Sequence, residues 1–137
     1  RRGTAEKKHE HLIMNDFNTQ KDEIGTLLYR LDDKKVPGIP FFTDSAWVWP
    51  KPEEIVMEAK AHSHEFDEII TVFGSNPDDP QDLGAEVEFW LEDEKYILTK
   101  STIVYVPKGL KHCPMIFRNV TRPIFHYIVG NAAGYAT

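Results

Sequence analysis

The chain has 137 residues, a net charge of −6 and a single cysteine, which is typical of one acidic domain. The acidic balance argues against nucleic acid or anionic membrane as a partner, because phosphate recognition needs clustered basic residues. One cysteine excludes an internal disulfide and fits a reducing compartment, and no apolar run approaches the roughly 18 residues of a membrane span, so we expect a cytoplasmic protein. The only basic run is interpreted as a solvated N-terminal tail and consists of Arg1, Arg2, Lys7 and Lys8.

The first 50 residues predict an arm followed by edge strands. Residues 1–23 are charged and polar, and we expect them to pack late, on this subunit or on another. Residues 23–31 predict a short strand or a turn of helix. Prolines between residues 37 and 52 rule out a long helix there, and residues 40–50 have the β-branched and aromatic character of an edge strand.

From residue 54 onward the pattern is one short strand after another. About seven or eight strands, with a loop at residues 75–84 and no convincing helix, predict an all-β sandwich or barrel. We therefore assign residues 51–137 to a barrel and residues 1–50 to an arm and edge strands that pack on it, within one structural domain. The expected strands cover residues 55–62, 66–73, 85–91, 96–99, 101–107, 115–120 and 123–129, with a hairpin turn at residues 92–95.

Three residues near the start of this region suggest a special site. His62, His64 and Glu68 share a parity, so on a strand their side chains would point to one face. Two imidazoles and a carboxylate on one face make either a costly polar patch or a metal site.

A second pattern, P-x-G-x-x-H, follows an apolar strand. Pro107 and Gly109 predict a tight turn that swings His112 back toward the sheet. Together the two stretches supply three histidines and one glutamate. Imidazole ligands suit zinc, copper, iron or nickel, and mixed nitrogen and oxygen ligation suits redox-active or Lewis-acid divalent metals.

These two stretches resemble the two motifs of the cupin superfamily over roughly residues 54–130. The resemblance implies a jelly-roll β-barrel of the cupin type, also called a double-stranded β-helix. In metal-binding cupins the three histidines and the glutamate hold one divalent ion. The resemblance therefore implies iron first, with manganese, nickel, zinc or copper as alternatives, held by His62, His64, Glu68 and His112.

The sequence departs from the cupin pattern at turns and not at ligands. Val56 stands where a glycine is expected before the first histidine, and Gly74 closes the first motif one residue early. Ser101 replaces the glycine that opens the second motif, and Ile116 replaces the asparagine after its histidine. The metal ligands are thus intact, while the subfamily and the reaction stay open.

We expect a metal-dependent enzyme that acts on a small organic molecule, with an iron-type dioxygenase or other oxidoreductase as the leading interpretation. A metal-dependent isomerase, lyase or decarboxylase is the first alternative, and a non-catalytic small-molecule-binding or sensing domain is the second. Glu68 is a candidate catalytic residue because, as an anionic ligand, it tunes the metal. His126 shares a parity with Ile124 and Ile128, so it either lines the barrel as an acid–base group or is a structural histidine.

Other residues have two interpretations each. Cys113 would point away from His112 on an extended segment, as a small buried hydrophobe. Glu58 and Lys60 share the parity of His62 and face either the cavity or solvent. The remaining candidates are Arg118 and Arg122, for a substrate carboxylate or solvent, and His9 and His11, interpreted as tail.

Aromatic residues in the first 50 positions suggest an oligomer. Trp47, Trp49 and Phe41 would wall a substrate pocket, pack in the core or seal an interface. An aromatic edge strand is a liability in water. We therefore expect a homodimer.

Overall fold

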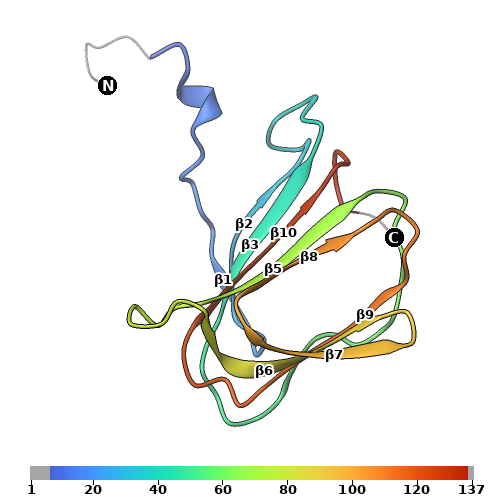
Figure 1. The fold of residues 1–137 in the computed structure, drawn as a ribbon. Coiled ribbons are helices and arrows are strands. Elements are labelled where there is room, and N and C mark those ends of the chain that lie inside the picture. Colours follow the sequence, from blue (N-terminus) through green and yellow to red (C-terminus); the bar gives the residue numbers. More distant parts are fainter. Residues whose placement is uncertain (1–6, 136–137) are drawn as a thin grey trace.

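The computed structural model describes residues 7–135 as two antiparallel β-sheets that face each other (Figure 1). This is a jelly-roll barrel, and the all-β prediction is confirmed. The elements are η1 (Glu10–Leu12, a 3₁₀ helix), β1 (Gln20–Lys21), β2 (Thr26–Leu31), β3 (Phe42–Val48), β4 (Ile55–Glu58), β5 (Glu68–Gly74), β6 (Asp82–Leu91), β7 (Glu94–Lys100), β8 (Thr102–Val106), β9 (His112–Arg118) and β10 (Ile124–Gly130).

The larger sheet has the strand order β1-β2-β3-β10-β5-β8, and the smaller one has the order β4-β9-β6-β7. Side chains of β5 alternate between the two faces of the larger sheet. Glu68, Ile70 and Val72 point inward and are only 3%, 5% and 1% exposed, so this face of the strand is buried between the sheets. The inward faces of the two sheets form one apolar core. Its buried members include Val48, Ile55, Leu83, Val87, Phe89, Val106, Met115, Phe117, Val120 and Ile124.

Two strand predictions are corrected by the topology. β4 ends at Glu58, so His62 and His64 lie in the irregular segment between β4 and β5 and not on a strand. The parity argument that placed them on one face is therefore wrong, although their position beside Glu68 is right. β3 is an interior strand paired with both β2 and β10, so the expected edge strand at residues 40–50 is also wrong. Its apolar character fits a strand that has a neighbour on each side.

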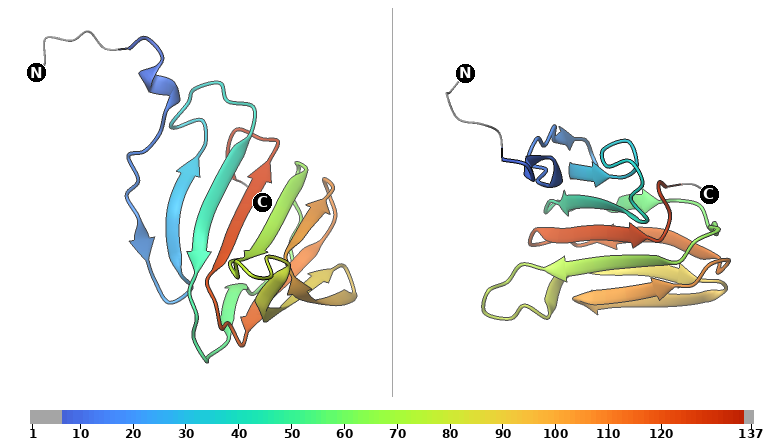
Figure 2. Two further views of the ribbon diagram at one scale, coloured as in Figure 1. Left: turned by 60° about the vertical axis from the view of Figure 1, so that its left-hand side comes forward. Right: turned by 90° about the horizontal axis from the view of Figure 1, so that it is seen from above.

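The part of the N-terminal arm around η1 stands away from the barrel (Figures 1 and 2). The arm is attached near β2, where the rings of Phe17 and Tyr29 lie 4.7 Å apart and Asp16 accepts a hydrogen bond from the Tyr29 hydroxyl at 3.1 Å. Lys7 and Lys8 are exposed, and the other two residues of the expected basic tail, Arg1 and Arg2, lie outside the described residues. Between residues 7 and 135, no helix is long and apolar enough to cross a membrane.

Candidate metal centre

The predicted turn of the second motif is present and is tied to the first motif. Leu110 N–H donates to the Pro107 carbonyl at 3.1 Å, and Gly109 takes the left-handed conformation with φ +85°. The Gly109 N–H donates to the carbonyl of His64 at 2.9 Å. The turn therefore delivers His112, the first residue of β9, to the segment that carries His64.

Three of the four predicted ligands converge at one buried point. The Oε1 atom of Glu68 lies 3.5 Å from Nε2 of His64 and 3.2 Å from Nε2 of His112. The three residues are only 3%, 4% and 1% exposed, in that order. One potential ligand atom from each lies within 4.8 Å of the other two. The geometry therefore brings together two imidazole nitrogens and one carboxylate oxygen.

The backbone determines which nitrogen of each imidazole is available. Nδ1 of His112 lies 2.9 Å from the carbonyl oxygen of Leu110, and Nδ1 of His62 lies 2.9 Å from that of Lys60. A carbonyl oxygen only accepts hydrogen bonds, so each Nδ1 carries the proton and each neutral ring keeps its lone pair on Nε2. Backbone carbonyls orient metal-ligating histidines in this way in known sites.

Two atoms at this point are suited to a positive ion. Within the described part of the chain, neither Oε1 of Glu68 nor Nε2 of His112 completes a hydrogen bond of normal geometry, although both are buried. Burial alone would lower the pKa of His112, but the Glu68 carboxylate and the Leu110 carbonyl raise it above its ordinary value. The site thus favours positive charge between these atoms, and its donor set fits a divalent metal ion.

The ring of His64 is held by aromatic neighbours. The Phe66 ring stacks on it with a centroid distance of 4.6 Å and an angle of 8°, and the Tyr135 ring lies edge-on at 5.0 Å. Behind them, a Cβ atom at Gly130 would overlap the rings of Phe42 and Phe66. Close packing therefore limits how far the His64 imidazole can rotate.

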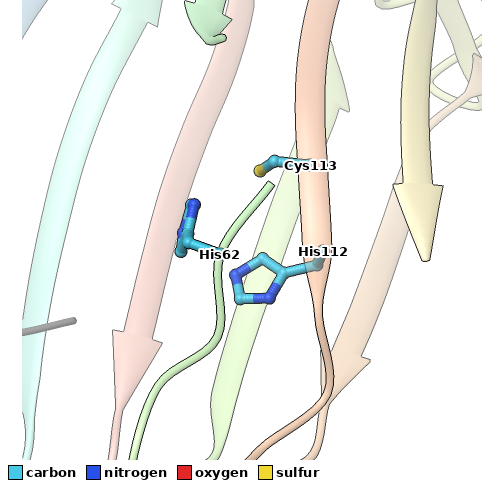
Figure 3. Close-up of side chains that lie close together, drawn as sticks. All are labelled: His62, His112 and Cys113. Carbon is cyan, nitrogen blue, oxygen red and sulfur yellow. The ribbon is translucent and has the colours of Figure 1, made fainter. Parts of the chain in front are cut away.

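The fourth predicted ligand, His62, belongs to a second group. Its ring centroid lies 4.5 Å from that of His112 and 4.7 Å from that of His64. Its ligand atom clusters within 4.8 Å of those of His112 and Cys113 (Figure 3). His62 thus flanks the convergent group and lines the same cavity.

Cys113 is buried as predicted, but its orientation is not the predicted one. Its φ of +78° breaks the extended alternation, so His112 and Cys113 both line the cavity. The pairing of β6 with β9 shifts register at the same place. Burial, followed by the nearby Glu58 and Glu68 carboxylates, raises the pKa of the Cys113 thiol to about 12, so it is a neutral thiol.

The convergent group opens into a cavity of about 340 Å³ between the sheets, at the small end of the range for ligand sites. His126 lines this cavity, as one of its two interpretations predicted. Its Nδ1 lies 2.8 Å from the Thr71 carbonyl oxygen, which leaves Nε2 as the acceptor of a neutral ring. Burial lowers the pKa of His126, against the Thr71 hydrogen bond and the Glu68 and Asp44 charges. His126 is thus a neutral imidazole at pH 7.

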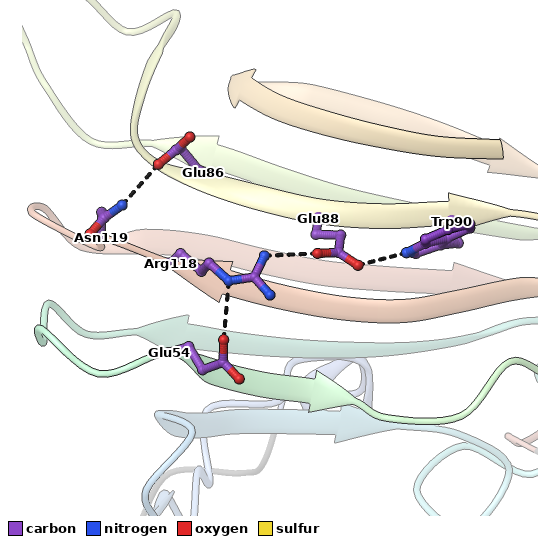
Figure 4. Close-up of polar contacts among 6 residues, drawn as sticks. All are labelled: Glu54, Glu86, Glu88, Trp90, Arg118 and Asn119. Atoms are coloured by element: carbon purple, nitrogen blue, oxygen red, sulfur yellow. Dashed lines mark hydrogen bonds and ion pairs between the residues drawn. The ribbon is translucent and has the colours of Figure 1, made fainter.

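The remaining candidate site residues differ in whether they line the cavity. Glu58 and Trp47 line it. Arg118 does not, because it pairs with Glu54 at 3.1 Å and with Glu88 at 2.8 Å on the outer side of the smaller sheet (Figure 4). Sequence reasoning missed several lining residues that no motif marks, among them Arg30, Asp44 and Tyr135.

No protein-family model matches the sequence, and no curated protein is significantly similar to it. Solved structures do match the fold. A Cupin 2 conserved barrel domain protein from Salinispora arenicola is 18% identical over 85% of this chain and 82% of its own, with a TM-score of 0.51. A recombinant oxalate oxidase, solved with glycolate, is 13% identical over 92% of this chain and 62% of its own, with a TM-score of 0.58.

A third match is the oxalate decarboxylase of Bacillus subtilis, which is 15% identical over 88% of this chain and 29% of its own, with a TM-score of 0.55. At these identities the similarity concerns the fold and not the reaction. The chain has the cupin fold, as its two motifs predict.

Proposed function

We propose that this protein is a metal-dependent enzyme that acts on a small organic molecule in the barrel cavity. The observation that carries the proposal is the convergence of His64, Glu68 and His112 on one buried point. A buried carboxylate and two oriented imidazoles are costly in an apolar barrel unless a positive ion accompanies them. His62, beside His112, is the proposed fourth ligand.

Iron is the proposed metal. His64, His112 and Glu68 make up the donor set of two histidines and one carboxylate found in non-haem iron oxygenases, and His62 would add a fourth ligand while still leaving positions open for other molecules. Such an ion would supply redox chemistry with dioxygen, so a dioxygenase or related oxidoreductase is the leading reaction class. Glu68 contributes the negative charge of the set, and the neutral histidines leave the ion Lewis acidic.

His126 is the proposed acid–base residue. It lines the cavity with a neutral ring whose Nδ1 proton is held by Thr71, so Nε2 is the atom able to accept a proton from a bound molecule. The lining also includes the apolar side chains of Ile70, Met115 and Ile128. These residues would bind the apolar part of the substrate.

The first alternative is an isomerase, lyase or decarboxylase that holds manganese, nickel, zinc or copper with the same residues. Matched structures of this fold include an oxalate decarboxylase and a sugar phosphate isomerase from Silicibacter pomeroyi. A binding or sensing domain without turnover is the second alternative. The three classes share one metal centre and differ in what happens to the bound molecule.

The deciding experiment screens a small-molecule library against iron-loaded protein for oxygen uptake. Substrate-dependent uptake supports the oxygenase, and turnover under anaerobic conditions supports the isomerase or lyase class. Binding without any turnover by protein loaded with each of the five metals supports the binding domain. The Glu68→Gln variant is the matched control, because it keeps the side-chain shape and removes the negative ligand.

A homodimer and a cytoplasmic location complete the proposal. Trp49 and Phe41 are 38% and 46% exposed, and Trp47 stacks on Trp49 with a centroid distance of 5.7 Å. Exposed aromatic groups of this kind favour association. Light scattering at micromolar concentration tests the dimer, and a monomeric mass would contradict it. The buried thiol of Cys113 is compatible with the reducing cytoplasm.

A further inference from the structure

The guanidinium group of Arg30 lines the cavity with its side chain 56% exposed, and it is already paired with a carboxylate. Nε of Arg30 donates to Oδ1 of Asp44 at 2.7 Å, and a second guanidinium nitrogen donates to Oδ2 at 2.9 Å. This bidentate pair joins neighbouring positions of β2 and β3. Among the described residues that line the cavity, Arg30 is the one arginine or lysine. An anionic substrate would therefore have to compete with Asp44 for it.

The cavity also contains a carboxylate with no such partner. The register of β4 against β9 shifts between Val56 and Glu58, and both Met57 and Glu58 line the cavity. Oε1 of Glu58 accepts a hydrogen bond from the Lys60 backbone N–H at 3.3 Å. Over residues 7–135, no lysine, arginine or histidine nitrogen lies within 4.0 Å of its carboxylate. Glu58 is therefore available to pair with a ligand.

The charge balance of the lining points the same way. Its four carboxylates face one guanidinium, and the histidines are counted as neutral. This leaves three net negative charges, which a divalent ion would reduce to one. A cavity lined mainly by one sign of charge concentrates ligands of the opposite sign. The carboxylates are those of Asp22, Asp44, Glu58 and Glu68.

We propose that the cavity selects a small organic cation, an amine with an apolar body, and that Glu58 is the residue that pairs with its ammonium group. The proposal rests on the proposed function in one respect, because it takes this cavity as the substrate site. Asp44 is the second specificity-determining residue, since it withdraws Arg30 from binding anions. The apolar wall and the ring of Trp47 accommodate the body of the ligand.

Three probes of similar size and different charge test the selection: benzylammonium, benzyl alcohol and benzoate. Their affinities are measured by titration calorimetry with chelator-treated protein and again with zinc-loaded protein. We expect benzylammonium to bind the chelator-treated wild-type chain at least about tenfold more tightly than benzoate, because hydrogen bonds between charged groups are the strong ones. The margin should be smaller with zinc, because a carboxylate can coordinate the open positions of that ion. Equal or tighter binding of benzoate to the chelator-treated protein would overturn the proposal without any variant.

Two variants assign the effect to residues. Glu58→Gln should reduce the preference for benzylammonium over benzyl alcohol to within about threefold, because it keeps the shape and removes the charge. Asp44→Asn should tighten benzoate binding about tenfold by releasing Arg30. Glu54→Gln, on the outer side of the smaller sheet, is the matched control and should keep the wild-type order of affinities. A Glu58→Gln protein with the full preference for the cation would contradict the role of Glu58.

The two proposals fail in different ways. If the chain holds no metal, the proposed function fails, while the chelator-treated protein still reports its charge preference. If metal binds and benzoate is preferred by chelator-treated protein, the selection of a cation fails while the metal centre stands.

Discussion

His62 and His112 exchange both of their backbone hydrogen bonds. The N–H of His62 donates to the carbonyl of His112 at 2.9 Å, and the N–H of His112 donates to the carbonyl of His62 at 2.8 Å. Backbone atoms alone thus join two residues that lie 50 positions apart in the sequence. Because the bridge uses only backbone atoms, a substitution that removes the His112 imidazole leaves it in place, and loss of the ligand can be separated from loss of the fold.

Metal affinity should fall as the pH falls from 8 to 6. A ligand must be deprotonated to bind a metal, and the pKa of His112 is raised, so protons compete at Nε2 at a higher pH than for an ordinary histidine. We expect about tenfold weaker binding for each pH unit below that pKa when one proton is displaced. Competitive zinc titrations at pH 6, 7 and 8 measure this. The His9→Ala variant is the control, and its zinc affinity should change with pH as that of the wild type does. A pH-independent affinity would exclude His112 as a ligand.

His126→Asn should slow turnover without removing the metal. The asparagine amide can still donate to the Thr71 carbonyl but cannot accept a proton as an imidazole does, so kcat/KM should drop by about 10²–10⁴-fold. Because burial lowers the pKa of His126, the wild-type rate measured at saturating metal should decline at a lower pH than an ordinary histidine would produce. Kinetics on the substrate found by the oxygen-uptake screen measure both effects. Wild-type activity in the variant would make His126 structural.

Cys113 should resist alkylation in the folded protein. With a pKa of about 12, its thiolate fraction at pH 8 is on the order of a thousand times smaller than that of a free thiol. Iodoacetamide labelling of chelator-treated protein, followed by mass spectrometry, should therefore be slower than labelling in denaturant by at least this factor. Equal rates in the two conditions would show that the thiol is exposed or ionised.

Gly74→Ala should destabilise the barrel. A Cβ atom at this position would overlap the backbone carbonyl oxygen of Asp82, which cannot rotate away as a side chain can. We expect the free energy of unfolding to fall by about 1–3 kcal/mol, as for other overpacked positions. Gly134→Ala is the control, because its Cβ would meet only Asp33 Oδ1 at 3.9 Å. Urea denaturation of both variants measures the difference, and equal stability would contradict this account.

The fold and the convergence of His64, Glu68 and His112 could be predicted because short motifs carry them. The turn at Pro107 and Gly109 needs particular residues at particular spacings, and its proline and glycine are visible in the sequence. His126 was placed by strand alternation, which holds along β10 because that strand pairs without a register shift on both sides.

What could not be predicted depends on irregular backbone and on pairing between distant strands. Cys113 faces the cavity because its left-handed φ interrupts the alternation of β9. Glu58 lines the cavity just after β4 shifts register against β9, and strand alternation in the sequence does not reveal such a shift. Arg30 and Asp44 meet only through the register of β2 with β3, which no local pattern reveals.

The most direct test of the metal centre is elemental analysis of protein purified without chelator or added metal. We predict that the wild-type chain contains about one equivalent of a divalent metal and that iron is the most abundant metal in it. His112→Ala should hold the metal at least about 100-fold more weakly, because even residues that only support a ligand contribute 10–100-fold. Its far-ultraviolet circular dichroism should be unchanged, since the backbone bridge to His62 remains. A wild-type protein that contains no metal and takes up none of the five candidate metals in solution would contradict the account.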